Sequence, residues 1–328
     1  MISLGIESTA DNLGVGIVSS DQVVLANYVN VHVPPEGGIH PREAARHHSE
    51  NMGNAIKTAL DQAGIKMDEV DIISFAQGPG LGPCLRTGAT GARALAIYLD
   101  TPLIGVNHCV AHVEIGRMAT GAKDPLTLYV SGGNTIVSGY ESGRYRIFGE
   151  TLDIAVGNCF DTFARAASLE YPGGPDIERK AALGNHLIQL PYTVKGMDLS
   201  YSGLLTAITS ELQTGLYSIE DLCFSLQETA YAMLGEVTER ALAHTNKPEL
   251  LLTGGVAANK RLSSMIRDIA EDHGAMPYVV PIKLAQDNGA MIAWTGIIAY
   301  NAGYRTSIDN SQVNPNWRMD QVEIPWRS

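Results

Sequence analysis

The chain repeats one strand pattern twice, over residues 4–31 and 126–151. In each copy, three short apolar runs are separated by a glycine-containing turn and a polar turn, which predicts an antiparallel meander. Beyond each meander, apolar strands that end in glycine-rich turns alternate with amphipathic helices, as in βαβ units. The longest of these helices are expected over 41–63 and 219–243. We therefore predict an α/β protein built from two similar lobes.

The two copies indicate where the domains begin and end. A chain of 328 residues exceeds what one hydrophobic core usually serves. We expect an N-terminal lobe over 1–125 and a C-terminal lobe over 126–328, with a mainly helical insertion over about 152–217. A duplicated fold predicts that the glycine turns of the two meanders face each other across a central cleft, where backbone N–H groups bind phosphate.

The composition indicates a globular, cytoplasmic protein. Hydrophobic residues make up 45% of the chain and charged residues 18%, and the four cysteines are scattered without a C-x-x-C pair, which argues against disulfides and a zinc ribbon. We expect no export and no membrane span, because the longest apolar stretch, 290–300, is shorter than the ~20 residues that cross a bilayer. The net charge of −12 repels nucleic-acid phosphates, so RNA binding would require partners or a local basic face.

Two histidines lie four residues apart in Asn107-His108-Cys109-Val110-Ala111-His112. On a helix, this spacing places both imidazoles on one face, about 5 to 6 Å apart at Cβ, as a metal ion requires. Asp287 is the candidate third ligand, because it follows the last expected strand and precedes an apolar helix. Two histidines and one carboxylate suit Fe(II) or Zn(II). A coincidental or capping histidine pair, and Asp287 as a helix N-cap, are the alternatives.

Two glycine-containing turns are candidates for binding a nucleotide. Ser131-Gly132-Gly133-Asn134-Thr135 lies at the turn of the second meander, where small residues let a phosphate approach backbone amides. Gly254-Gly255-Val256-Ala257-Ala258-Asn259 lies between a strand and a helix, which is a nucleotide-binding location in open α/β sheets. An ordinary hairpin turn, and a βα turn in which Asn259 caps the helix, are the alternatives.

Four carboxylates are further candidates, namely Glu7, Asp11, Asp161 and Glu178. Carboxylates near a nucleotide commonly bind ribose hydroxyls, hold a metal or accept a proton. A surface or capping role is the alternative for each of them.

A set of motifs occurs in a fixed order along nearly the whole chain. They are Gly5-Ile6-Glu7-Ser8-Thr9-Ala10-Asp11, Asn107-His108-x-x-x-His112, Tyr129-Val130-Ser131-Gly132-Gly133-Asn134-Thr135, Gly157-Asn158-x-Phe160-Asp161, Tyr171-Pro172-Gly173-Gly174-Pro175, Gly254-Gly255-Val256-Ala257-Ala258-Asn259 and Asp287-Asn288-Gly289-Ala290-Met291. In this order they resemble the TsaD/OSGEP family of tRNA N6-adenosine threonylcarbamoyltransferases. The resemblance implies the duplicated actin-like ATPase fold (ASKHA, RNase H-like), in agreement with the two lobes predicted from the repeats.

The resemblance also implies a reaction and its residues. The family transfers a threonylcarbamoyl group from threonylcarbamoyl-adenylate to N6 of the adenosine next to the anticodon in tRNAs that read ANN codons. Carried over by motif, the metal ligands are His108, His112, Tyr129 and Asp287, and the phenolate of Tyr129 favours iron over zinc. The residues implied to contact the nucleotide, threonylcarbamoyl-adenylate or ATP, are Tyr129, Val130, Ser131, Gly132, Gly133, Asp161, Gly174, Glu178 and Asn259. Asp11 is our candidate for assisting the attacking amine.

Tyr129 and Asn134, on either side of Ser-Gly-Gly, resemble the archaeal and eukaryotic branch of the family. Members of that branch work on tRNA inside the KEOPS complex, which includes a small protein kinase/ATPase. The chain departs from the family pattern at Ala285-Gln286, where Cys-Thr is more usual, and at Thr162, where lysine is common. The first departure bears on packing at the metal site and the second on nucleotide affinity.

Three alternative functions compete with this interpretation. An ATPase or small-molecule kinase of the actin-like superfamily would use the same phosphate-binding turns, but two histidines in the cleft count against it. A metallopeptidase is disfavoured because the chain lacks H-E-x-x-H. The acidic charge disfavours an RNA-binding scaffold that acts alone.

Overall fold

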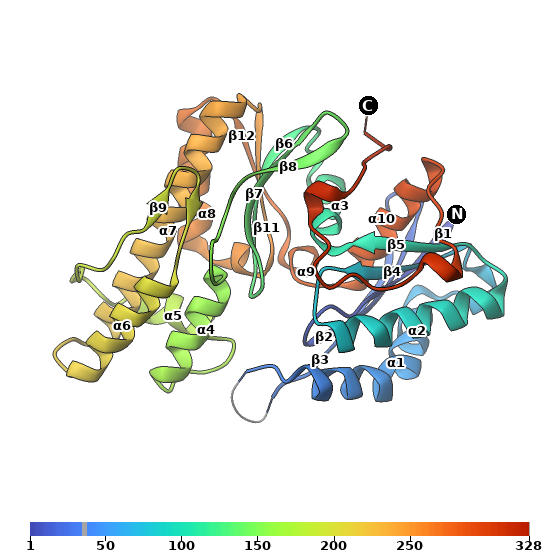
Figure 1. The fold of residues 1–328 in the computed structure, drawn as a ribbon, viewed down its shortest axis with the longest axis horizontal. Helices are drawn as coiled ribbons and strands as arrows, with labels where there is room; N and C mark the ends of the chain where they lie inside the picture. Colours follow the sequence, from blue (N-terminus) through green and yellow to red (C-terminus); the bar gives the residue numbers. More distant parts are fainter. Residues whose placement is uncertain (35–37, 328) are drawn as a thin grey trace. The chain divides into compact units, whose positions relative to one another are not determined.

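The structure, a computed structural model, describes residues 1–34 and 38–327, which divide into two compact units (Figure 1). Unit 1 comprises Met1–Ala119, Glu141–Tyr145 and Gln286–Ser328, and unit 2 comprises Thr120–Tyr140 and Arg146–Ala285. Each unit contains one five-stranded sheet. Among the described residues, no helix is both long and apolar enough to cross a membrane.

Unit 1 has the sheet order β3-β2-β1-β4-β5. The first three strands are antiparallel neighbours, while β4 pairs parallel with β1 and β5 pairs parallel with β4, which confirms the predicted meander and parallel strands. The strands are β1 Ile2–Glu7, β2 Asn12–Ser19, β3 Val24–Val31, β4 Ile72–Gly78 and β5 Leu103–Asn107. The helices are α1 Pro41–Ala63, α2 Gly82–Leu99, α3 His108–Thr120 and α10 Gly289–Asn301, with short 3-10 helices η1 Met67–Glu69, η3 Ile308–Asn310 and η4 Met319–Gln321.

Unit 2 repeats this topology with the order β12-β11-β6-β7-β8. β6 and β7 are antiparallel, and β11 lies parallel to both β6 and β12, so the predicted duplication is confirmed at the level of strand order. The strands are β6 Pro125–Val130, β7 Thr135–Glu141, β8 Arg144–Glu150, β11 Glu249–Thr253 and β12 Met276–Val279. The helices outside the insertion are α7 Ile219–Thr245, η2 Gly255–Ala258, α8 Lys260–Asp272 and α9 Ile282–Ala285.

Helices and one short hairpin form the regular structure of the segment over 152–217. It contains α4 Val156–Ala166, α5 Gly173–Ala181 and α6 Ser202–Thr214, together with a short hairpin of β9 Val194–Lys195 and β10 Asp198–Leu199. Asp153 binds the start of α6, because its carboxylate accepts hydrogen bonds from the backbone N–H groups of Tyr201 (2.9 Å) and Ser202 (3.0 Å) and from the Ser200 hydroxyl. A carboxylate from 49 residues earlier in the chain therefore satisfies N–H groups in the first turn of this helix.

Glycine residues let α10 pack directly against the sheet of unit 1, backbone to backbone. Leu4 and Ile6 point into the core that contains α1 and α2, so Gly5 lies on the opposite face of β1. A Cβ atom built on Gly5, Gly16 or Gly289 would lie 2.3, 2.1 or 2.0 Å from backbone atoms across the contact between β1, β2 and α10. Because no side chain fits here, the start of α10 is held directly against the two strands.

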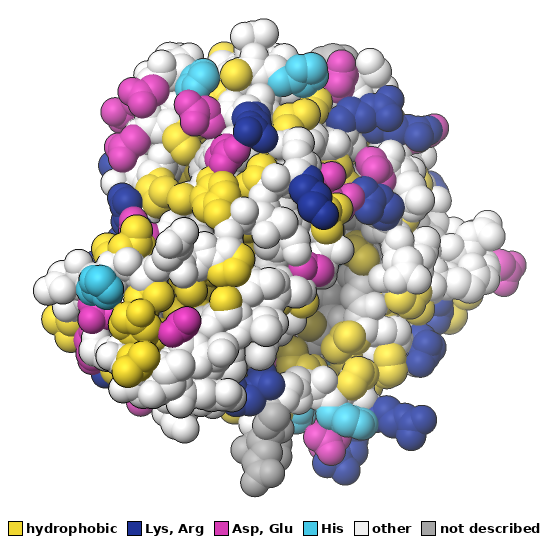
Figure 2. Space-filling view, turned by 60° about the vertical axis from the view of Figure 1, so that its left-hand side comes forward, with side chains coloured by type: hydrophobic (Ala, Val, Ile, Leu, Met, Phe, Trp, Pro, Cys, Tyr) yellow, Lys and Arg dark blue, Asp and Glu magenta, His cyan; other side chains and the backbone are white. Residues whose placement is uncertain are grey.

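Charged side chains of both signs are mixed on the surface. On the face shown in Figure 2, acidic, basic and apolar side chains are interspersed, and lysine and arginine form no continuous field. This agrees with the net charge of −12 and gives no sign, on that face, of a strong electrostatic attraction for RNA.

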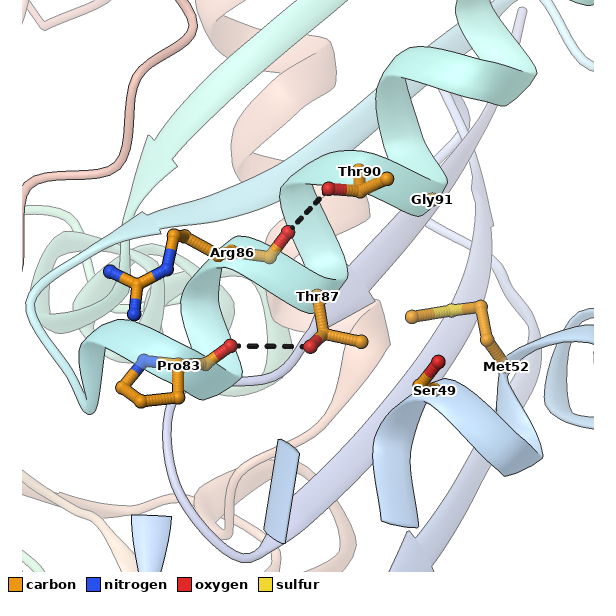
Figure 3. Close-up of a pocket in the computed structure, with 7 residues that line it drawn as sticks. All are labelled: Ser49, Met52, Pro83, Arg86, Thr87, Thr90 and Gly91. Carbon is orange, nitrogen blue, oxygen red and sulfur yellow. Dashed lines mark hydrogen bonds between the residues drawn. The ribbon is translucent and has the colours of Figure 1, made fainter. Parts of the chain in front are cut away.

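A shallow groove of about 490 Å³ lies between α1 and α2 (Figure 3). Its residues are Ser49 and Met52 of α1 and Pro83, Arg86, Thr87, Thr90 and Gly91 of α2. The threonine hydroxyls donate to carbonyl groups of their own helix, Thr87 to Pro83 (3.2 Å) and Thr90 to Arg86 (2.8 Å). None of the predicted site residues lines this groove.

The contact between α10 and the sheet predicts opposite effects of two glycine-to-alanine changes. Gly16→Ala should lower the free energy of unfolding by about 1–3 kcal/mol or more, because the new methyl overlaps the Ala290 backbone. Gly53→Ala should raise it by up to about 1 kcal/mol, because Gly53 is an exposed position of α1 with no atom near its would-be Cβ. Urea unfolding of both variants tests this, and equal effects would contradict it.

Asp153 predicts a pH-dependent contribution to stability. Burial alone would raise the pKa of Asp153, but the hydrogen bonds from Ser200 and its neighbours outweigh burial and lower the pKa. Its contribution should therefore be complete above the unfolded-state pKa of ~3.9 and decline as the pH falls below it. Asp153→Ala should cost about 1 kcal/mol at pH 7, as for other lost helix caps. Urea unfolding at pH 7 and pH 3 should show the larger loss at pH 7, and equal losses would refute the role of the charge.

Candidate metal centre

The two predicted histidine ligands lie on the first turn and a half of α3. The helix begins at His108, directly after β5, and the Asn107 side chain accepts a hydrogen bond from the backbone N–H of Val110 (3.1 Å). The four-residue spacing places the imidazoles on one helix face, with ring centroids 4.7 Å apart. Both rings are buried, but they face carboxylates rather than an apolar interior.

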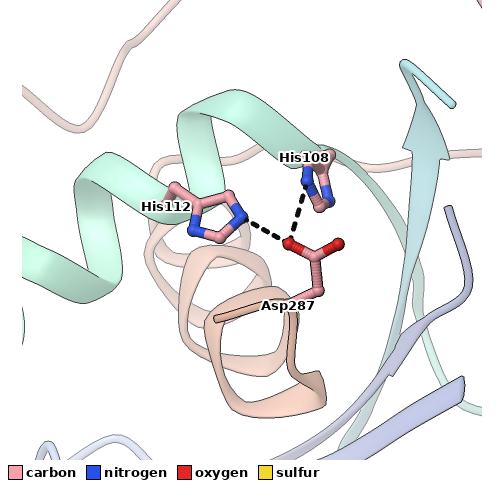
Figure 4. A group of neighbouring side chains, drawn as sticks. All are labelled: His108, His112 and Asp287. Carbon is pink, nitrogen blue, oxygen red and sulfur yellow. Dashed lines mark hydrogen bonds and ion pairs between the residues drawn. The ribbon is translucent and has the colours of Figure 1, made fainter. Parts of the chain in front are cut away.

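Asp287 lies beside these two rings (Figure 4). Its Oδ1 is 3.0 Å from Nε2 of His112 and 3.5 Å from Nε2 of His108, and the three ligand atoms lie within 4.8 Å of one another. The alternative that Asp287 caps α10 is wrong, because the cap is Asn288, whose side chain accepts the N–H of Met291 at 3.0 Å. The structure therefore brings together His108, His112 and Asp287 as a candidate metal site within unit 1.

Glu7 orients His108 from the end of β1. The Glu7 carboxylate is fully buried, and its Oε2 lies 3.0 Å from Nδ1 of His108. Because a carboxylate only accepts, Nδ1 carries the proton, and in the neutral ring this leaves the Nε2 lone pair available toward Asp287. The other Glu7 oxygen accepts the N–H of Thr9 at 2.7 Å and the Thr9 hydroxyl. A histidine held by a carboxylate in this way is the usual support of a metal-binding imidazole.

The charges at the site favour a cation. Burial alone would lower the pKa of His108, but the carboxylates of Glu7 and Asp287 outweigh it and raise that pKa to about 9. Burial likewise would raise the pKa of Asp287, yet the two imidazoles lower it. The pKa of His112 is lowered, chiefly by burial. A divalent ion would replace a proton as the positive charge between these groups, and the donor set fits Fe(II) or Zn(II).

The Ser131–Asn134 turn connects β6 and β7 in unit 2. It is closed by a hydrogen bond from the N–H of Ser131 to the carbonyl of Asn134 (2.8 Å) and by one from the N–H of Asn134 to Oγ of Ser131 (3.0 Å). Gly132 and Gly133 are exposed, and nothing lies within 4 Å of their would-be Cβ atoms. A ligand can therefore approach this backbone closely, although the geometry is also that of an ordinary hairpin turn. The hydroxyl of Tyr129 lies 3.4 Å from Ser131 Oγ and 3.3 Å from Asn134 Nδ2.

Asp161 and Gly174 are brought together at the start of α5. Oδ1 of Asp161, on α4, accepts the backbone N–H of Gly173 at 2.8 Å. Burial raises the pKa of this carboxyl group despite that bond. Gly174 follows in the first turn of α5, with nothing within 4 Å of its would-be Cβ.

Glu178 and Asn259 form a second group. Oε1 of Glu178 accepts the backbone N–H of Lys260 at 2.8 Å. The Asn259 side chain caps α8 by accepting the N–H of Leu262 (3.0 Å), which confirms the capping interpretation, and it also donates to Gln227 (3.1 Å). Tight backbone packing of Gly254 against Val130 joins this turn to the end of β6.

Asp11 lies in unit 1, just before β2 and away from the three clustered ligands in sequence. Its backbone carbonyl accepts the N–H of His32 at 2.8 Å. The pKa of the nearby Cys84 thiol is raised to about 11, first by the burial of that thiol and second by the negative charge of Asp11. From the sequence, Glu7 is only one of four acidic candidates, and its pairing with His108 is not predicted. A glutamate at the buried end of an otherwise apolar strand was the available signal.

Comparison with known proteins identifies the family. Residues 23–294 match the TsaD family of tRNA N6-adenosine threonylcarbamoyltransferases. A protein of that name from Thermococcus kodakarensis is 56% identical over 326 residues, covering 99% of this chain and all of the relative. A probable bifunctional tRNA threonylcarbamoyladenosine biosynthesis protein from Methanocaldococcus jannaschii is 55% identical, and this chain spans 60% of its length.

Solved structures of low sequence identity support the predicted fold. HypF of T. kodakarensis superposes with a TM-score of 0.65 at 15% identity, over 94% of this chain and 49% of HypF. Component A of the (R)-2-hydroxyglutaryl-CoA dehydratase of Acidaminococcus fermentans gives a TM-score of 0.57 at 15% identity, over 90% of this chain and 97% of that protein. These structural similarities confirm the actin-like fold, and at 15% identity they do not bear on the activity.

The site geometry predicts how metal affinity responds to mutation. His112→Ala and Asp287→Ala should each abolish tight binding of Co²⁺, used as a spectroscopic probe, because each removes a ligand. Glu7→Gln should weaken binding roughly 10- to 100-fold, because it loosens the support of His108 while leaving the ligands in place. Titration followed by visible absorbance tests this, with His273→Ala in unit 2 as the control. Native affinity in Glu7→Gln would refute the supporting role.

Proposed function

The chain belongs to the family of tRNA N6-adenosine threonylcarbamoyltransferases, and from this premise we propose that it transfers a threonylcarbamoyl group from threonylcarbamoyl-adenylate to N6 of the adenosine next to the anticodon in tRNAs that read ANN codons. The observation that carries the proposal is the group of two buried histidines, His108 and His112, with the partly buried Asp287 in a family member, and with Glu7 supporting His108. A kinase of the same fold would have no use for this set of ligands, since phosphoryl transfer relies on Mg²⁺ and oxygen ligands.

His108, His112 and Asp287 would hold the metal ion, and we propose Tyr129 as a fourth ligand. A phenolate oxygen beside two imidazoles and a carboxylate makes iron the preferred ion and zinc the alternative. When bound, such an ion would polarise the carbonyl of the threonylcarbamoyl group. Glu7 would keep the proton of His108 on Nδ1, away from that ligand position.

The residues of unit 2 would hold the adenylate. We propose that the Val130–Gly133 backbone binds its phosphate, since Gly132 and Gly133 are exposed and leave room for a ligand. Asp161, Gly174, Glu178 and Asn259 would contact the remainder of the nucleotide. Asp161 accepts a hydrogen bond from the N–H of Gly173 in α5, and Glu178 accepts one from the N–H of Lys260 in α8. These bonds support the assignment, because they fix both side chains in place before a ligand binds.

The reaction requires a proton acceptor for the attacking amine. A bond forms between N6 of adenosine and the carbamoyl carbon, the bond from that carbon to the phosphate oxygen breaks, and AMP leaves. The amine loses one proton in this exchange, and we propose that the carboxylate of Asp11 accepts it. Orientation of the two substrates would supply most of the rate enhancement.

We propose that partner subunits contribute to tRNA binding. The net charge of −12 and the mixed surface in Figure 2 support this, because neither gives the chain a strong attraction for RNA. KEOPS subunits, including a small protein kinase/ATPase, are the proposed partners. Two relatives are named as probable bifunctional biosynthesis proteins, and this chain spans 60% of each, so each carries additional sequence beside the shared part.

Transfer of labelled threonine to tRNA tests the proposed function. In a reconstituted reaction with the partner subunits, His112→Ala should reduce transfer at least 100-fold, and Asp11→Asn roughly 10²- to 10⁴-fold if Asp11 is the proton acceptor. His273→Ala, an exposed histidine paired with Glu239 in unit 2, should retain native activity. Rapid phosphorylation of a small molecule, together with native transfer by His112→Ala, would favour the kinase alternative.

A further inference from the structure

We propose that the C-terminal segment, residues 304–327, positions the metal ligands by holding α3 at its start and at its middle, with Glu114 as the buried attachment point. The inference rests on the proposed metal site and adds positioning residues to it. Glu114, Tyr145 and Trp326 are not among the proposed ligands, and their hydrogen bonds meet at Glu114 of α3, so we expect them to act through the helix.

The segment first lies along β5 and then passes the end of β4, two parallel strands of unit 1, before it reaches α3. Thr306 exchanges two hydrogen bonds with β5, one from its N–H to the carbonyl of Leu103 (3.0 Å) and one from the N–H of Gly105 to its hydroxyl (2.9 Å). Further along, the N–H of Asn314 donates to the carbonyl of Gln77 at the end of β4 (2.8 Å). A Cβ on Gly78 would lie 1.9 Å from the Asn314 carbonyl, so the segment passes directly over this strand.

The first attachment lies immediately before the metal ligands. Nδ2 of Asn107 donates to the backbone carbonyl of Trp317 at 2.9 Å, while Oδ1 of the same side chain accepts the N–H of Val110 at 3.1 Å. One amide group therefore links the C-terminal segment to the first turn of α3. His108, the next residue, begins the helix.

The second attachment lies two residues after His112. Glu114 is 1% exposed, and its carboxylate receives hydrogen bonds from three side chains. Oε1 accepts from the Tyr145 hydroxyl (2.6 Å) and from Nε1 of Trp326 (3.0 Å), and Oε2 accepts from Arg117 (2.6 Å). Arg327, next to Trp326, donates to the Tyr145 hydroxyl at 3.1 Å. Burying a carboxylate costs free energy unless its oxygens accept hydrogen bonds, so loss of one donor should disturb α3 around Glu114.

The two attachments enclose the ligand positions. Asn107 and Glu114 are seven residues apart, which on a helix corresponds to about 10 Å. His108 and His112 both lie between them. A metal site requires its ligands to be held within about 0.5 Å of their working positions. A helix attached at one point only would tilt or slide by more than that, whereas attachment at two points, before His108 and after His112, restrains the ligands between them.

The conservative variant Trp326→Phe tests the proposal, because it removes the indole N–H and keeps an aromatic ring. Trp317→Phe is the matched control: its indole N–H donates no hydrogen bond within the described part of the chain, and the backbone carbonyl that Asn107 uses is retained. We expect Trp326→Phe to weaken Co²⁺ binding to the full-length protein roughly tenfold and to alter the visible absorption bands, and Trp317→Phe to do neither.

The outcomes separate positioning from simple stabilisation. A Trp326→Phe protein with a lower melting temperature but native Co²⁺ affinity and native absorption bands would overturn the proposal. If Trp326→Phe does not fold, Tyr145→Phe removes the other donor to Oε1 and should show the same loss of affinity. If His112→Ala retains native affinity, the metal site itself is refuted; if His112→Ala loses affinity and both donor variants keep it, only the positioning role is refuted.

Discussion

The start of α10 lies against β1 and β2 with glycine backbone at the contact, and the candidate metal centre depends on this close approach. Asp287 immediately precedes the helix cap Asn288 and the first helical residue, Gly289. Gly5 and Gly16 let that end of the helix approach within a distance that any side chain would block. The carboxylate is thereby placed beside α3, where the two imidazoles meet it. Asp287 and His112, which are 175 positions apart in sequence, thereby become neighbours.

Buried carboxylates near α3 are satisfied in two different ways. Glu114 receives hydrogen bonds from the hydroxyl, indole and guanidinium groups of Tyr145, Trp326 and Arg117, which are permanent donors. Asp287 instead faces imidazole nitrogens, which can give up a proton and bind a metal ion. The same type of residue thus serves as an attachment point in one place and as a ligand in the other, and the identity of its neighbours makes the difference.

Local sequence signals predicted most of the secondary structure and part of the site. Pro41 and Gly64 delimit α1 as expected, since proline suits the first helical turn and Gly64 adopts a left-handed conformation at its end. Ser218 caps α7, and the four-residue spacing of His108 and His112 places both rings on one face. Each of these features depends on residues within a turn or two of one another, so a short stretch of sequence contains all the information.

The role of Asp153 shows where local signals end. Its position before the insertion gives no indication that it binds the first turn of α6, because the contact spans 49 residues. Asp287 was equally ambiguous, since an aspartate before a helix is commonly a cap, and only the neighbouring Asn288 in that role left it free to face α3. The pairing of Glu7 with His108 could not be inferred either, because the end of β1 and the start of α3 come close together only when the sheet forms.

The sequence by itself determined the duplicated pattern of strands and helices, the bounds of α1, the start of α7 and the family, because periodicity, caps and ordered motifs are properties of the linear chain. The tertiary structure alone decided which carboxylate supports His108, which one joins the ligand set, and how the C-terminal segment reaches the start and the middle of α3. These choices depend on distances between segments that are remote in sequence. Such distances are set by packing, above all by the glycine contact of α10 with the sheet.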